Sequence, residues 1–169
     1  FGPSPFRRVA EFAEQLLASL VAELGGPPRA QLIPGMSAKD AEKQHGDAAS
    51  GGQLASMARS HLGGLLYLAR GARPDILEAV ASLAREVTRW GPACDARLKR
   101  IYGYLLRTPT AALLMSWSPR QDRLSVVGYC DSDLGGDLAT SRSTSGFAVA
   151  VRGTPADAWC LIDLGSKRQ

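Results

Sequence analysis

The chain has 169 residues, of which 45% are hydrophobic and 21% charged, with a formal net charge of +4. This balance is typical of a globular chain of one or two domains and excludes a largely disordered one. No apolar run approaches the roughly 20 residues of a membrane span, and the first residues lack the basic-then-apolar order of a secretory signal. We therefore expect an intracellular protein that is neither secreted nor bound to a membrane. Because the first residue is not Met, we also expect a fragment or a processed piece.

The basic residues are 16 Arg against 4 Lys. Arginine forms bidentate bonds to phosphate, which makes nucleic acid a candidate partner. The alternative is a solvated basic surface encoded by a GC-rich genome, and charge alone favours this second interpretation. Three cysteines, Cys94, Cys130 and Cys160, lie far apart with no CxxC pair. This spacing argues against a zinc site or a disulfide framework and indicates a reducing compartment.

The N-terminal part is predicted to be one long helix followed by a loop. Ser4-Pro5 suits a helix start, and apolar residues at helical spacing continue to Gly25-Gly26, which end the helix. Residues 25–52 are rich in Gly, Pro, Ala and charge, so we expect a loop or a poorly ordered linker. Within it, Ser37 could cap a short turn.

Three further helices are predicted before residue 108. The first runs from about Gly52 to Leu68. The second starts at Arg73-Pro74-Asp75, because proline and an acid both suit a first helical turn, and Gly91-Pro92 ends it. The third covers roughly Ala93 to Arg107.

After Thr108-Pro109 the apolar period changes from helical to strand-like. AALLMSWS, RLSVVGYCD, STSGFAVAV and DAWCLIDLG are predicted to be four strands separated by turn residues. The last three are expected to form an antiparallel meander over 123–131, 143–152 and 158–165, with 111–118 as a connector or an edge. The predicted fold class is therefore α+β, with helices first and an incomplete antiparallel sheet second.

Asp131 and Asp133 are the main candidates for chemistry. Two acids two residues apart point to the same face of a strand that continues through both, and their oxygens suit magnesium. One strand supplies too few ligands for a two-metal site, and such acids more often form turns and caps. Arg142 and the three hydroxyl residues after it, Ser143, Thr144 and Ser145, could bind phosphate. A solvent-exposed hairpin end explains these residues equally well. Cys94 and Cys130 lack a nearby His–Asp arrangement, so nucleophilic catalysis is not expected.

Several strings resemble one protein family. LGGLLYLARGARPDILEAV (Leu62–Val80) is similar to GSLLYLA-x-x-TRPDI-x-x-AV in the Pol polyprotein of copia-type LTR retrotransposons. GYCDSDLGGDLATSRSTSGF (Gly128–Phe147) resembles that family's GYSDADWAGD-x-x-T-RRSTSGY. LKRIYGYLLRTP (Leu98–Pro109) and IDLGSKRQ (Ile162–Gln169) resemble its strings LKRILRYLKGTP and ISW-x-SKKQ. The order and approximate spacing agree, so the resemblance covers about Ala58 to Gln169. Cys94-Asp95 stands where the family has His-Trp.

The resemblance implies three regions and a chemistry. Residues 1–52 would be an N-terminal helix and linker, 53–110 the helical thumb or connection of a reverse transcriptase, and 111–169 a truncated RNase H-like domain. In that family the RNase H domain cleaves the RNA strand of RNA–DNA hybrids with magnesium held by carboxylates. Asp131 matches the first catalytic, metal-binding acid, and Asp133 matches the second acid of the same string.

The resemblance also implies partners and a location. An RNA–DNA hybrid or a template–primer duplex would be contacted by basic residues, and the rest of the Pol protein is a further partner. The expected location is the cytoplasm, a virus-like particle or the nucleus. The basic residues are Arg73, Lys99, Arg100 and Arg142, although Arg73 has the alternative of pairing with Asp75.

The 169 residues lack the YxDD motif of the polymerase and the later RNase H carboxylates. We therefore expect the isolated chain to be inactive. Strands without covering helices would also leave an apolar sheet face bare, which predicts poor solubility or association with a partner. The alternatives to a Pol fragment are a non-catalytic nucleic-acid-binding helical module and a degenerate remnant of a retroelement.

Overall fold

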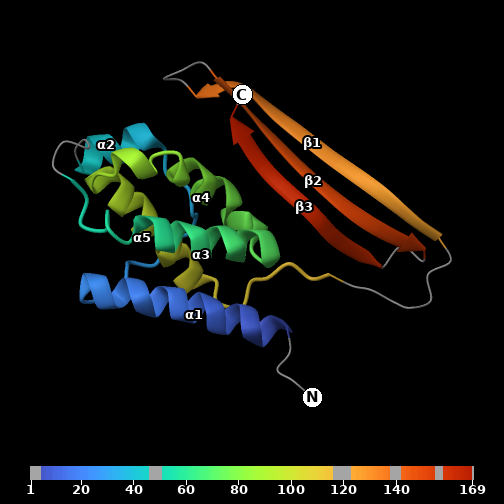
Figure 1. The fold of residues 1–169 in the computed structure, drawn as a ribbon, viewed down its shortest axis with the longest axis horizontal. Coiled ribbons are helices and arrows are strands. Elements are labelled where there is room, and N and C mark those ends of the chain that lie inside the picture. The colour runs from blue at the N-terminus through green and yellow to red at the C-terminus, as the bar shows by residue number, and fades with distance from the viewer. Residues whose placement is uncertain (1–4, 46–50, 116–122, 138–141, 155–157, 169) are drawn as a thin grey trace. The chain divides into compact units, whose positions relative to one another are not determined.

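The computed structural model describes residues 5–45, 51–115, 123–137, 142–154 and 158–168. In these residues, five α-helices precede three β-strands (Figure 1). The prediction of an α+β fold, with helices first and antiparallel strands second, is confirmed. The chain divides into a helical unit, Phe1–Ala112, and a sheet unit, Leu113–Gln169. The finer division at residues 52 and 110 stays a prediction. Among the described helices, none is long and apolar enough to cross a membrane.

Helix α1 spans Pro5–Leu24, as predicted, and Gly25 ends it with a positive φ of 73°. It packs on α3, which spans Ala58–Gly71. A Cβ added at Gly64 of α3 would lie 2.5 Å from a methyl carbon of Leu16, so the missing side chain lets α1 approach closely. The two helices also share an edge-to-face ring contact (Phe12–Tyr67) with centroids 5.4 Å apart.

The predicted loop after α1 is confirmed for residues 26–37, but it is not a free linker. It lies against α5 (Pro92–Arg107): the Gln31 N–H donates to the Gly103 carbonyl at 3.1 Å. A Cβ at Gly103 would collide with the carbonyl oxygen of Arg29, so this contact requires glycine. The loop leads into α2 (Ala38–His45).

Ser37 caps α2, as predicted. The backbone N–H of Asp40 donates to Ser37 Oγ at 3.1 Å, and the Ser37 hydroxyl donates back to the Asp40 carboxylate at 2.7 Å. This exchange satisfies one of the free N–H groups in the first turn of the helix.

The remaining helical elements follow the predicted order with shifted bounds. After α3 come the 3-10 turn η2 (Pro74–Ile76), α4 (Leu77–Ala84), the 3-10 turn η3 (Val87–Arg89) and α5. Proline occupies the first turn of both η2 and α5, where its missing N–H costs nothing. The largest fully buried side chains belong to this unit: Leu20, Leu54, His61, Leu65, Ile76, Val80, Leu83, Leu98, Ile101 and Tyr102.

The sheet unit holds β1 (Arg123–Asp137), β2 (Arg142–Thr154) and β3 (Trp159–Arg168) in the order β1-β2-β3. Both pairings are antiparallel, which confirms the predicted meander. The strands extend further than predicted because cross-strand pairing continues beyond the apolar runs. The strand predicted over 111–118 is wrong for residues 111–115, which have no regular structure, and its remainder lies outside the described residues.

Candidate functional site

The predicted acid pair lies within β1 and not at its end. Asp131 is exposed and lies opposite Gly146 of β2 in the ladder. Its carboxylate accepts a hydrogen bond from the Ser132 N–H at 2.9 Å. Asp133 pairs with Thr144, and its side chain lies outside the described residues. No group of three or more His, Cys, Asp or Glu side chains in the described parts of the chain could hold a metal ion. Magnesium binding by Asp131 and Asp133 stays a prediction.

Three of the four predicted nucleic-acid-binding residues belong to the helical unit, and the fourth belongs to the sheet unit. Arg73 is buried, whereas Lys99 and Arg100 on α5 are half-buried. The Arg100 Nε–H donates to the Gly35 carbonyl at 2.9 Å, which ties α5 to the loop before α2. Arg142 begins β2 in the other unit, and its side chain lies outside the described residues. Phosphate contacts by these residues stay a prediction.

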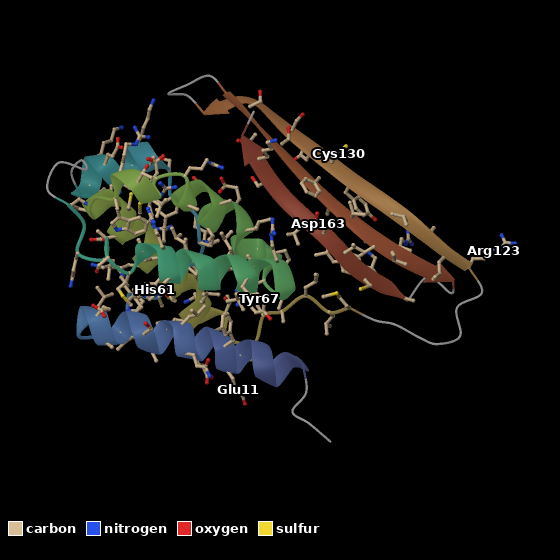
Figure 2. All side chains as sticks on the ribbon, viewed as in Figure 1. Glu11, His61, Tyr67, Arg123, Cys130 and Asp163 are labelled. Carbon is tan, nitrogen blue, oxygen red and sulfur yellow. The ribbon has the colours of Figure 1, made fainter. Side chains whose placement is uncertain are left out.

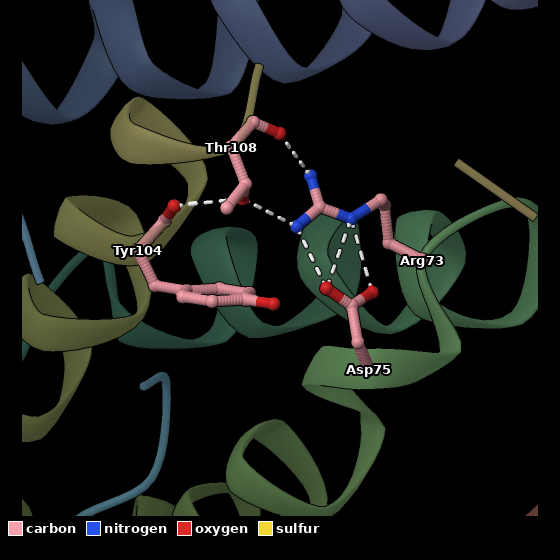
Figure 3. A network of polar contacts seen from close by, with 4 residues as sticks. All are labelled: Arg73, Asp75, Tyr104 and Thr108. Atoms are coloured by element: carbon pink, nitrogen blue, oxygen red, sulfur yellow. Dashed lines mark hydrogen bonds and ion pairs between the residues drawn. The ribbon is translucent and has the colours of Figure 1, made fainter. Parts of the chain in front are cut away.

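Arg73 joins the turn after α3 to the end of α5 (Figure 3). Its guanidinium, with the side chain 3% exposed, donates to both oxygens of Asp75, the closest contact being 2.7 Å from Nη2. It also donates to the carbonyl oxygen of Thr108 at 2.9 Å and to its hydroxyl at 2.7 Å. The Tyr104 ring lies 5.5 Å below the guanidinium carbon, at cation–π distance. The alternative that Arg73 pairs with Asp75 is therefore the arrangement observed.

This network sets the charge state of Asp75. Burial pushes the pKa of Asp75 upward, but hydrogen bonds from Arg73 and Tyr104 and the Arg73 charge outweigh it. The pKa therefore lies below its ordinary value. Burial, together with the hydrogen bond to Asp75 and its charge, raises the pKa of Tyr104. Both groups thus keep the charge states that hold the network together at neutral pH.

Sequence reasoning missed a second buried network, centred on Asp95 in the first turns of α5. One carboxylate oxygen accepts the Trp90 indole N–H at 2.7 Å and the Leu54 N–H at 3.1 Å. The other accepts the Gln53 N–H at 2.6 Å. A Cβ at Gly52 would lie 2.6 Å from the Trp90 ring, so this segment can approach only as glycine. The available sequence signal was Asp95, four residues after Gly91, together with Trp90 directly before that glycine.

A third buried polar pair joins α3 and α5. His61 Nδ1 lies 2.8 Å from the Tyr102 hydroxyl, and both side chains are fully buried. Whichever group donates, His61 Nε2 has no hydrogen-bond partner among the described residues. Burial lowers the pKa of His61, and the opposing charge of Glu23 only partly offsets this. The imidazole is therefore neutral at pH 7.

The sheet unit exposes apolar side chains along β1. Leu124, Val126 and Tyr129 are well exposed, with Val126 at 71%. Cys130 is a free, exposed thiol on the same strand (Figure 2). Apolar side chains that are exposed in this way mark surfaces that contact other molecules.

Comparison with known proteins adds one finding. No family model and no solved structure matches the chain. The chain is similar to the Secreted RxLR effector protein 161 of Plasmopara viticola, with 35% identity over 94 residues. The matched region is 56% of this chain and 64% of the relative, so the chain spans less than two thirds of that protein. The relative is a secreted effector.

This finding overturns the functional interpretation of the sequence strings. The prediction of a retrotransposon Pol fragment with reverse-transcriptase and RNase H ancestry is wrong, because the similar protein is a secreted effector. The retrotransposon keywords and the expectation of an intracellular, non-secreted protein are contradicted by the same finding.

The physical reason lies in what the strings do in the fold. Arg73, Pro74 and Asp75 form a helix start and the buried network with Thr108, so this string serves folding. Gly128–Phe147 supplies two paired strands. Strings that satisfy such structural needs do not by themselves specify a chemistry.

Proposed function

We propose that this chain is a secreted protein of the effector type, which acts through contacts of its surface. The observation that carries the proposal is the 35% identity to a secreted RxLR effector over 94 residues. The Arg-x-Leu-Arg string to which that relative's name refers does not occur in these 169 residues. The similarity therefore lies elsewhere in the sequence.

The distribution of polar groups supports action by binding. The buried charges Arg73 and Asp95 make internal hydrogen bonds that connect distant segments of the helical unit. The exposed apolar side chains of β1 are instead available to another molecule. A surface of this composition favours a protein–protein contact over a reaction centre.

Secretion is the property to test first. The native gene in the source organism is extended with an epitope tag at its end, so that any preceding residues are retained. We expect the tagged protein to be enriched in the culture medium relative to an intracellular enzyme measured in the same fractions. Retention in the cell fraction, while a known secreted protein reaches the medium, would overturn the proposal.

A further inference from the structure

We propose that β1 pairs with β1 of a second copy of this chain, in an antiparallel two-fold arrangement that joins the two three-stranded sheets into one. The partner is thus a second copy of the protein. This inference concerns assembly and does not depend on whether the chain is secreted. It rests on the edge geometry, the exposure and the charges of β1.

β1 is an edge strand of unusual regularity. It pairs with β2 on one side, and no strand among the described residues pairs with its other side. Its register runs without a break from Arg123 opposite Thr154 to Asp133 opposite Thr144. Such an edge presents a row of backbone N–H and C=O groups that can pair with another chain, and it carries neither a proline nor a bulge over this range.

The other edge lacks these properties. β3 has a register shift where Val149 pairs with Asp163 and Ala150 pairs with Leu161, so Ile162 is an extra residue there. Bulges twist an edge and interrupt its hydrogen-bonding row. Lys167 near the end of β3 adds a charge of the kind that discourages edge pairing. The open edge that suits a second strand is therefore β1.

The exposure of β1 agrees with a free edge. Every described residue from Arg123 to Ser132 is exposed except Val127, which is half-buried. The exposed set includes three large apolar side chains, Leu124, Val126 and Tyr129. Pairing with a second copy would cover part of this apolar surface, and each Å² removed from water contributes about 25 cal/mol.

Charge complementarity selects the second copy and its register. An antiparallel pair centred on Val127 places Arg123 opposite Asp131 of the other copy, and two-fold symmetry forms this contact twice. Both side chains are exposed, and neither takes part in an ion pair within the described residues. Arg123 extends outward at the start of β1 (Figure 2). Opposite charges directly across a sheet stabilise pairing, whereas like charges oppose it.

The same register also fits the uncharged residues. It places Val126 opposite Gly128, where the β-branched side chain meets no Cβ, and Ser125 opposite Tyr129. Leu124 comes opposite Cys130 of the other copy. Because paired residues in an antiparallel ladder share a face, Leu124, Val126 and Cys130 of both copies lie on one face of the joined sheet.

A charge swap tests the proposal. Sedimentation velocity over a concentration series measures the dimer dissociation constant of the full chain and of three variants. We expect Arg123→Asp and Asp131→Arg each to weaken dimerisation by about tenfold, because two cross-strand pairs become repulsive at once. The double variant, which restores both pairs in reversed order, is expected to recover the native constant. Circular dichroism of each variant confirms that the fold is retained.

Cysteine cross-linking tests the register independently. In the proposed pairing, Leu124→Cys lies opposite Cys130 of the second copy and should give a disulfide-linked dimer under mild oxidation. Within one copy the two positions lie six residues apart on one strand, roughly 20 Å, so they cannot bridge internally. Val126→Cys is the matched control, because it would face Gly128 and should not cross-link.

Three results would overturn the proposal. The first is a monomer at the highest concentration reached. The second is a dimer that neither charge reversal weakens. The third is a disulfide-linked dimer of Val126→Cys, or of the native chain through Cys130, while Leu124→Cys forms none. Either outcome indicates a strand register different from the one proposed.

Discussion

The helical unit buries three of its charged residues in hydrogen-bond networks, whereas the sheet unit exposes the charges of Arg123 and Asp131 on β1. In the helical unit, Arg73, Asp95 and Arg97 are buried, and each makes hydrogen bonds that connect segments distant in sequence. In the sheet unit, Arg123, Asp131 and Asp163 lie at the surface. These three buried side chains therefore form internal hydrogen bonds, whereas the exposed charges of the sheet unit remain available for an external contact.

This difference matters because the cost of removing a charge depends on what remains behind. A buried partner left without its bond keeps the full penalty of being out of water, whereas an exposed partner is simply rehydrated. We therefore expect substitutions in the buried networks to lower the free energy of unfolding, and substitutions on β1 to act mainly on association. Hydrogen exchange, read separately for the two units, measures the first effect.

The largest effect is expected for Asp95→Ala. This change leaves the Trp90 indole N–H and the backbone N–H groups of Gln53 and Leu54 without their acceptor. We expect the helical unit to lose about 3–5 kcal/mol, since each buried unsatisfied donor costs about 1–3 kcal/mol. Protection from hydrogen exchange over α3 and α5 measures the loss. Glu78→Ala is the control, because Glu78 is exposed and its contact with Arg85 spans 4.0 Å; a similar loss in this variant would contradict the role of burial.

Arg73→Met is expected to have the next largest effect. It removes the bonds to Asp75 and Thr108 while keeping much of the side-chain volume. We expect a loss of about 2–3 kcal/mol at pH 7, because a partly buried carboxylate and a carbonyl lose a charged donor. Arg73→Lys should recover little of it, since an ammonium cannot reproduce the forked geometry. Full recovery by lysine would show that charge alone matters.

The same variant should change the response to acid. The folded pKa of Asp75 lies below its ordinary value of 3.8, so its stabilisation is complete above that pH and is lost as pH falls through the folded value. Native protein should therefore lose stability below about pH 4 more steeply than Arg73→Met. Chemical denaturation at a series of acid pH values measures the two slopes, and equal slopes would contradict the pairing.

The lowered pKa of His61 predicts a second loss of stability toward acid pH, which arises from burial of the imidazole and not from an ion pair. Its folded pKa is lowered by burial, so the unfolded chain takes up a proton at about pH 6.5 while the folded chain does not. The free energy of unfolding should therefore fall as pH drops below 6.5, by at most about 1.4 kcal/mol per pH unit. His61→Gln cannot titrate, can still bond Tyr102, and should remove this slope. Denaturation between pH 7.5 and 5 decides the point, and an unchanged slope would assign it to another group.

Local patterns predicted much of the fold. The spacing of apolar residues and the positions of proline placed α1 and α5, and alternation placed the three strands in the right order. The start of α3 was predicted six residues too early, because Asp95 holds Gln53 and Leu54 in turns from more than 40 residues away. No local signal carries such a contact.

The candidate site was less predictable for the same reason. Asp131 was predicted correctly as a strand residue, but what surrounds it depends on pairing with β2. Arg73 was chosen for its charge, whereas its burial follows from the position of Thr108 at the end of α5. Function was read from strings whose residues serve helix starts and strand pairing, and a secreted relative contradicted that reading.

The smallest effect is expected for Phe147→Ala on β2. The Phe147 ring lies over Gly165 of β3, its cross-strand partner, where an added Cβ would collide with the ring. An aromatic side chain over a strand glycine shields the backbone that lacks a side chain of its own. Because the ring is itself partly exposed, we expect a loss of only about 0.5–1 kcal/mol, confined to the sheet unit. Hydrogen exchange of β3 measures it, and Phe147→Leu, which keeps some cover, should lie between the two. A loss that spread to the helical unit would show that the two units do not hold their stability separately.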